Sequence, residues 1–143
     1  MKALVVYFSR GGNAVKIAED VAKELDCESF DGETLKPDLS GVDLLVIGSG
    51  TFDGKLGEKL LEFLKNIPRV SNKKAAIFST CGLIDPPKSI EYIKRTLEDL
   101  GYEVVLDIYC FGKHKTARHG QHADDDSKEA VAFARDIKRR TGM

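Results

Sequence analysis

The stretch ALVVYFSRGGNAVKIA, residues 3–18, decides the fold. A short apolar run rich in β-branched and aromatic residues ends at Ser9, two glycines follow, and an apolar pattern of helical period then begins. This pattern predicts a buried strand, a tight turn and a helix whose N-terminus points back across the end of the strand. Such a turn directs free backbone N–H groups and the positive end of the helix dipole at one point. An anion, most often a phosphate, suits that point.

The rest of the chain alternates apolar runs with amphipathic segments. The apolar runs predict further strands, and the segments of helical period predict helices that bury one face each. The predicted strands are residues 27–30, 42–48, 74–80 and 102–111, and the predicted helices cover residues 14–25, 56–67, 86–100 and 124–140. Residues 32–41 predict a loop that is too short for a full crossover helix. This order indicates an α/β fold with a parallel sheet covered on both faces.

Three predicted strands end in small residues, at Ser9–Gly12, Gly48–Thr51 and Ser79–Gly82. Right-handed crossovers bring the carboxyl ends of parallel strands to one edge of the sheet, which is where ligands bind in open α/β sheets. Small residues leave the backbone accessible and leave room for a ligand. The sequence therefore predicts a ligand site that all three strand ends share.

Composition narrows the class of protein. A chain of 143 residues predicts a single domain, 1–143, and the net charge of −1 gives no support to nucleic-acid or anionic-membrane binding. No apolar run has the length needed to span a bilayer, and Met1 leads directly into the first strand with no room for a signal peptide, so we expect a cytoplasmic protein. Three widely spaced cysteines predict reduced thiols, without a disulfide framework or a Cys-x-x-Cys metal site.

Several motifs resemble those of the flavodoxin family, in its short-chain form, over essentially the whole chain. YFSRGGN is similar to the phosphate loop [ST]-x-T-G-x-T: Ser9 and Gly12 match, while Gly11 and Ala14 replace threonines. IGSGTFDG is similar to the second loop G-S-P-T-Y-x-G, with Gly50 in place of proline. STCGLIDPP occupies the place of the third flavin loop, and HGQHADDDSKEAVAFA resembles the stretch before the last helix.

The resemblance implies a three-layer sandwich with a five-stranded parallel sheet of order 2-1-3-4-5. It also implies FMN as a non-covalent cofactor and a role in electron transfer. The implied contacts to the FMN phosphate are Ser9, Arg10, Gly11, Gly12, Asn13 and Ala14. The implied contacts to the flavin ring are Gly50, Thr51, Phe52, Asp53, Gly54, Ser79, Thr80, Cys81 and Gly82. Among these, Phe52 would lie against the ring and the Asp53–Gly54 peptide would accept a hydrogen bond from the reduced flavin.

A flavodoxin-type carrier implies redox partner proteins: a reductase or ferredoxin-type donor, and an acceptor enzyme. We expect a monomer or a weak homo-oligomer. Two alternatives remain open on the same fold, an FMN-dependent NAD(P)H or quinone oxidoreductase and a domain that has lost FMN binding. A phosphorylated receiver domain is excluded, because Ser9–Arg10 and Gly48–Ser49 stand where that class needs acidic residues. No catalytic residue is assigned.

Three further features have alternative interpretations. Cys81 is either a ligand-facing thiol or a small residue that fits a crowded turn, and no basic residue flanks it to activate a thiolate. A loop with three histidines suggests a metal site, a contact to an acidic redox partner, or a solvated loop, and its spacing fits no zinc pattern; the histidines are His114, His119 and His122. We assign no metal. Tyr92, at helical spacing, is expected to be half-buried.

Overall fold

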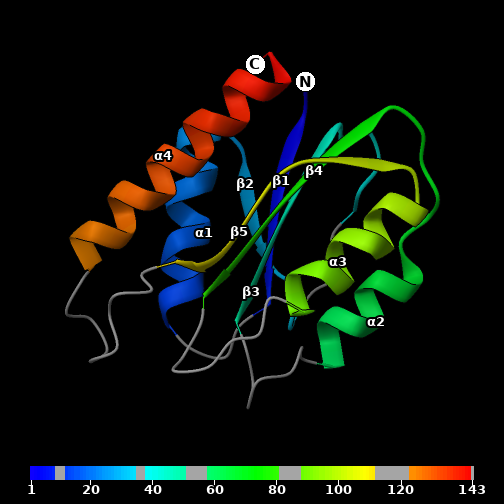
Figure 1. Ribbon diagram of the computed structural model, residues 1–143, viewed down its shortest axis with the longest axis horizontal. Coiled ribbons are helices and arrows are strands. Elements are labelled where there is room, and N and C mark those ends of the chain that lie inside the picture. Colours follow the sequence, from blue (N-terminus) through cyan, green and yellow to red (C-terminus); the bar gives the residue numbers. More distant parts are fainter. Residues whose placement is uncertain (9–11, 35–37, 51–57, 81–87, 112–122, 143) are drawn as a thin grey trace.

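The computed structural model of this chain describes residues 1–8, 12–34, 38–50, 58–80, 88–111 and 123–142. The described strands form one five-stranded sheet in the order β2-β1-β3-β4-β5, and every neighbouring pair is parallel (Figure 1). The strands are β1 (Ala3–Phe8), β2 (Glu28–Asp31), β3 (Leu44–Gly50), β4 (Lys73–Thr80) and β5 (Tyr102–Phe111). The fold class and the strand order predicted from the sequence are confirmed.

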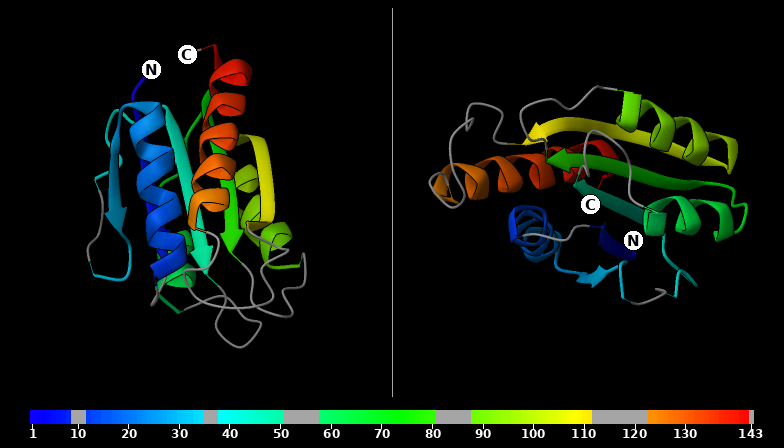
Figure 2. Two further views of the ribbon diagram at one scale, coloured as in Figure 1. Left: turned by 90° about the vertical axis from the view of Figure 1, so that its left-hand side faces the viewer. Right: turned by 90° about the horizontal axis from the view of Figure 1, so that it is seen from below.

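Helices cover both faces of this sheet. On one face lie α1 (Gly12–Leu25) and α4 (Ala123–Thr141), and on the other lie α2 (Glu58–Asn66) and α3 (Lys88–Asp99), as Figures 1 and 2 show. Side chains of the central strands alternate between two buried clusters: Val5 and Val46 pack toward α1 and α4, whereas Val6 and Ile47 pack toward α2 and α3. Burial on both faces explains the continuous apolar runs of these strands. None of the described helices combines the length and the apolar character needed to cross a membrane.

Most boundaries lie within two residues of those predicted from the sequence. β2 begins one residue later than predicted, and α4 begins at Ala123, one residue earlier. The main difference is in β3, which continues beyond Gly48 to Gly50. It continues because its last residues pair on both sides, with β1 up to Ser49 and with β4 up to Gly50. The small residues at this position therefore belong partly to the sheet itself.

Three described helices end at residues with left-handed backbone conformation: α1 at Asp26, α3 at Gly101 and α4 at Gly142. After α1, Asp26 has φ 55° and the N–H of Cys27 donates to the carbonyl of Ala22 at 2.9 Å. After α3, Gly101 has φ 106° and lies directly against the backbone carbonyl of Val70. A side chain at position 101 would overlap that carbonyl, so glycine is required there for both space and conformation.

The amino edge of the sheet is closed by polar contacts. The backbone N–H of Lys2 donates to Asp43 Oδ2 at 3.0 Å, and Lys73 Nζ lies 3.0 Å from Asp43 Oδ1. These contacts, led by the Lys2 hydrogen bond, lower the pKa of Asp43. Asp43 thus joins the strands that begin at this edge, and the predicted site lies at the opposite edge.

Candidate functional site at the carboxyl edge of the sheet

The carboxyl ends of the central strands are in register. Phe8, the last residue of β1, pairs with Ser49 of β3, and Ser49 pairs with Ser79 of β4. One residue further along, Gly50 pairs with Thr80. Figure 2 shows these strand ends together at one edge of the sheet. The sequence prediction that the strand ends meet is therefore confirmed for their described residues.

The side chains at two of these positions, Ser49 and Ser79, are small. Ser49 and Ser79 are each only 1% exposed, and each is the last residue of its strand whose burial the structure describes. Their side chains are among the smallest that a strand can place at this point, and both have interaction partners. A flat group approaching the edge would therefore meet the strand backbones without displacing a large side chain.

The N-terminus of α1 lies at the same edge. The helix begins at Gly12, four residues after the last residue of β1, and its first turn contains no acidic side chain. The first N–H groups of a helix have no partner inside the helix, and the dipole places partial positive charge there. Since no carboxylate occupies this turn, the positive end of α1 is chemically suited to an exogenous anion.

Gly48 has a packing role that sequence reasoning missed. A Cβ at this position would overlap the ring of Phe78, which pairs with it from β4. The Phe78 ring is fully buried and packs edge-on against Phe133 of α4, with ring centroids 5.9 Å apart. The glycine therefore lets an aromatic ring cross β3 just below the edge. Only a contact between distant residues requires it, and nothing in the local pattern beyond the glycine itself indicates that contact.

The structure brings together six of the fifteen predicted contacts. These are the first residues of α1 and the last residues of β3 and β4, namely Gly12, Asn13, Ala14, Gly50, Ser79 and Thr80. The other nine lie outside the described residues: Ser9, Arg10, Gly11, Thr51, Phe52, Asp53, Gly54, Cys81 and Gly82. The same holds for the three histidines, His114, His119 and His122. Their predicted roles stay predictions.

In the described part of this edge, the ionisable group with a shifted pKa is a tyrosine. Burial, helped by the charges of Asp31 and Glu19, raises the pKa of Tyr7, so this hydroxyl is neutral at physiological pH. Among the described residues, no group of three histidine, cysteine or acidic side chains is arranged to hold a metal ion. The described part of the site is thus built from backbone groups and small side chains, which suits binding of a cofactor that brings its own reactivity.

The fold is that of a doubly wound α/β protein, and the carboxyl ends of β1, β3 and β4 form its candidate ligand site. A family model described as a flavodoxin domain matches residues 4–117. An uncharacterized protein of Methanocaldococcus jannaschii, MJ0298, is 33% identical over 151 residues, which cover 96% of this chain and 98% of that protein. The chain belongs to the flavodoxin-domain family.

Solved structures have the same fold. A flavodoxin of Streptococcus pneumoniae superposes with a TM-score of 0.74 at 19% identity, covering 98% of this chain and 99% of that one. Oxidised flavodoxin 2 from Bacillus cereus superposes with a TM-score of 0.64 at 26% identity, covering 94% and 99%. The superpositions extend over nearly the whole of each chain, so the similarity is one of complete domains.

Proposed function

We propose that this protein binds FMN at the carboxyl edge of the sheet and transfers electrons between redox partner proteins. The observation that carries the proposal is the common edge at which β1, β3 and β4 end in register beside the N-terminus of α1. Membership of the flavodoxin-domain family supports it.

The described residues fit this cofactor. The dipole and free N–H groups of α1 are suited to a phosphate, and no acidic side chain in the first turn competes for them. Ser49 and Ser79 place no large side chain at this edge, which would suit a flat ring. Bound FMN would supply the redox chemistry, since it accepts and donates electrons reversibly.

Residues of this chain would bind and orient the group. In the proposal, the backbone N–H groups of Gly12, Asn13 and Ala14 hold the phosphate together with residues 9–11. The backbone at Gly50 and Thr80 borders the ring, and residues 51–54 and 81–82 complete its surroundings. The loops would also exclude water from the ring and fix which of its edges faces a partner protein.

The partners would recognise a surface without a strong charge. The net charge is −1, so long-range steering of a partner by the whole protein is weak. Recognition would depend on short-range contacts around the exposed part of the flavin. A reductase or ferredoxin-type donor and an acceptor enzyme are the proposed partner classes.

Amide shift mapping in solution tests this proposal. ¹⁵N-labelled protein is titrated with FMN and, as a control that lacks only the phosphate, with riboflavin. We expect FMN to shift the amides of Gly12–Ala14, Gly50 and Thr80, and riboflavin to shift those of the strand ends but not those of α1. Absence of saturable shifts at the strand ends with both flavins would overturn the proposal.

A kinetic assay separates the carrier from an oxidoreductase on the same fold. The FMN-loaded protein is mixed with NADPH, with and without an added flavodoxin reductase. We expect flavin reduction only when the reductase is present. Rapid reduction by NADPH alone would instead support an NAD(P)H oxidoreductase.

A further inference from the structure

The connection between β2 and β3 leaves part of one sheet face open. Parallel strands are usually joined through a helix that packs on the sheet. In this connection the described residues, 32–34 and 38–43, contain no helix. α2 lies on the same face, and a groove of about 560 Å³ separates it from the connection. The groove exists because one helix of the usual layer is replaced by a short segment.

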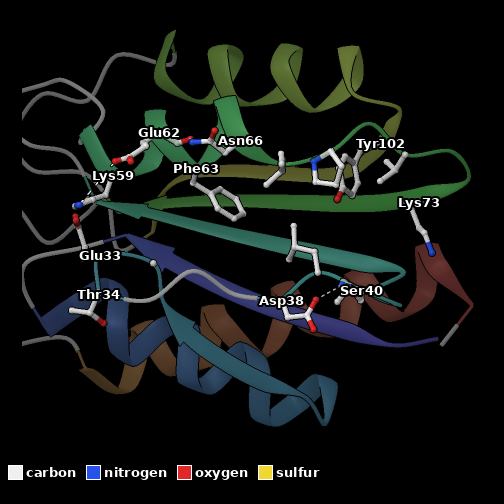
Figure 3. A pocket seen from close by; sticks show the side chains of 16 residues that line it. Glu33, Thr34, Asp38, Ser40, Lys59, Glu62, Phe63, Asn66, Lys73 and Tyr102 are labelled. Atoms are coloured by element: carbon white, nitrogen blue, oxygen red, sulfur yellow. Dashed lines mark hydrogen bonds and ion pairs between the residues drawn. The ribbon is translucent and has the colours of Figure 1, made fainter.

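The interior of the groove is apolar. Leu39 and Val42 line it from the connection, and Phe63 and Ile67 line it from the α2 side, as the close view in Figure 3 shows for Phe63. Val42 and Ile67 are buried, and Phe63 and Leu39 are partly buried. The volume is within the range of roughly 300–1,000 Å³ that is typical of small-molecule sites.

Tyr102 supplies a polar group at one end of this groove. The residue is only 5% exposed, and in Figure 3 its hydroxyl lies on the side of the ring that faces the other lining residues. No described residue forms a hydrogen bond with that hydroxyl, and since no buried side-chain oxygen of the described residues lacks a partner, the hydroxyl is open to the solvent of the groove. Desolvation raises the pKa of Tyr102, which keeps the phenol neutral. A molecule in the groove would replace that solvent as the hydrogen-bond partner of the hydroxyl.

The charges that line the groove do not cancel. Both lysines have partners: Lys73 contacts Asp43 at 3.0 Å, and Lys59 lies 4.0 Å from Glu62. Among the described residues, Glu33 and Asp38 have no such ion-pair partner.

The charged residues that line the groove are three carboxylates, Glu33, Asp38 and Glu62, and two lysines, Lys59 and Lys73, so the described lining has a net charge of −1. Asp38 accepts a hydrogen bond from the backbone N–H of Ser40 at 2.9 Å, which lowers its pKa and keeps it ionised. Figure 3 shows Asp38 toward the same end of the groove as Tyr102, and Glu33 toward the other end. A ligand with a positive charge would complement this lining, and an anion would be repelled.

We propose that this groove is a second binding site, separate from the strand-end site, and that its ligand is a small organic amine with an apolar body. The body packs on Phe63, Leu39 and Val42, while the protonated amine donates to the Tyr102 hydroxyl and is attracted by Asp38. Tyr102 begins β5 and pairs with Lys73, the first residue of β4, so this end of the groove lies at the amino edge of the sheet. The proposed amine position is therefore at the opposite edge of the sheet from the strand-end site.

The test uses tryptamine as the probe and indole-3-acetate as its control, because the two share a ring and carry opposite charges. Each is titrated into the ¹⁵N-labelled full-length protein while the backbone amide shifts are followed. We expect tryptamine to shift the amides of Leu39, Val42, Phe63 and Tyr102 saturably, and indole-3-acetate to bind at least ten-fold more weakly. No saturable shift with tryptamine, or equal affinity for the two probes, would overturn the proposal.

A pair of tyrosine variants tests the hydrogen bond. Tyr102→Phe removes only the hydroxyl and preserves the buried ring, while Tyr92→Phe makes the same change at a tyrosine that is 46% exposed on α3. We expect Tyr102→Phe to weaken tryptamine binding about five- to ten-fold, the value of one net hydrogen bond, and Tyr92→Phe to leave it unchanged. Equal affinities of the two variants would contradict the assigned role of Tyr102. FMN binding is measured in parallel and should be unchanged in both variants, so failure here is distinguishable from failure of the strand-end site.

Discussion

Replacement of Asn13 by aspartate should change helix stability and FMN affinity in opposite directions. Asn13 is the second residue of α1, and the first turn of that helix contains no acidic side chain. A carboxylate there interacts favourably with the helix dipole, by about 0.3–1 kcal/mol. The same carboxylate repels a phosphate held at that end of the helix. The single added charge should therefore stabilise the protein and weaken its cofactor binding.

The expected loss of FMN affinity follows from Coulomb's law. Neighbouring side chains on a helical turn are about 5–6 Å apart. At that separation, and with the dielectric constant of water, a unit charge repels a phosphate dianion by about 1–2 kcal/mol, which raises the Kd roughly five- to thirty-fold. The effect should decrease as salt is added, because salt screens Coulombic repulsion.

The assay combines flavin fluorescence titration with thermal unfolding of the flavin-free protein. Asn66→Asp is the matched control, because it makes the same chemical change at the last residue of α2, where a negative charge opposes the dipole. We expect Asn13→Asp to raise the Tm by roughly 1–3 °C and to weaken FMN binding, and Asn66→Asp to lower the Tm without affecting FMN. Riboflavin affinity should be the same in both variants. If Asn13→Asp weakens riboflavin as much as FMN, or weakens neither, the assigned phosphate position is refuted.

Three further predictions concern stability and reactivity. Gly101→Ala should destabilise the protein by about 1–3 kcal/mol more than Gly41→Ala in urea unfolding, since both glycines have positive φ but only position 101 is blocked by a backbone carbonyl; equal losses would contradict this. Asp43 has a lowered pKa, so its contact with Lys73 stabilises the protein above about pH 4 and is lost as the pH falls further. In Asp43→Asn, the free energy of unfolding should therefore depend less on pH in this acidic range. Burial raises the pKa of Cys27 to about 11, so peptide mapping should find it almost unalkylated by iodoacetamide at pH 8.

The fold could be predicted from the sequence because its signals are local. The runs of Val, Leu and Ile in β1 and β3 are continuous since both sheet faces are buried, and helical periodicity marks the segments between them. Even so, β3 was expected to end at Gly48 and ends at Gly50, because its length depends on pairing with both neighbours. A strand end that depends on pairing with a partner strand cannot be predicted from the local sequence pattern.

The meeting of the strand ends was predictable for a similar reason. Glycine and serine at three strand ends could be recognised in the sequence, and parallel topology was enough to bring Ser49 beside Ser79. The role of Gly48 was not predictable, since it depends on the ring of Phe78 from another strand. Tyr92 was expected to be half-buried and is 46% exposed, while Ile93 and Leu97 occupy the buried positions of α3.

The groove could not be foreseen from the sequence. The loop between β2 and β3 was predicted, but its consequence depends on what lies opposite. Phe63 and Tyr102 come from α2 and from the first position of β5, and only the folded chain brings them to one cavity. In the sequence, a tyrosine at the start of a strand gives no sign that its hydroxyl faces a groove.

The strength of FMN binding is a further expectation from the sequence. Gly11 and Ala14 stand where the flavodoxin phosphate loop has threonines, and each lost hydrogen bond to a charged group costs about 1.5–3 kcal/mol. We therefore expect an affinity weaker than that of a protein with the full motif. A sub-nanomolar Kd in a flavin fluorescence titration would contradict this expectation.

The visible spectrum of the purified protein tests the central claim most directly. The protein is incubated with excess FMN, separated from free flavin by gel filtration and scanned between 300 and 550 nm, with riboflavin treated in the same way. The account predicts flavin absorption bands that elute with the protein after incubation with FMN and are weaker after riboflavin. A colourless protein that also fails to quench FMN fluorescence would contradict it.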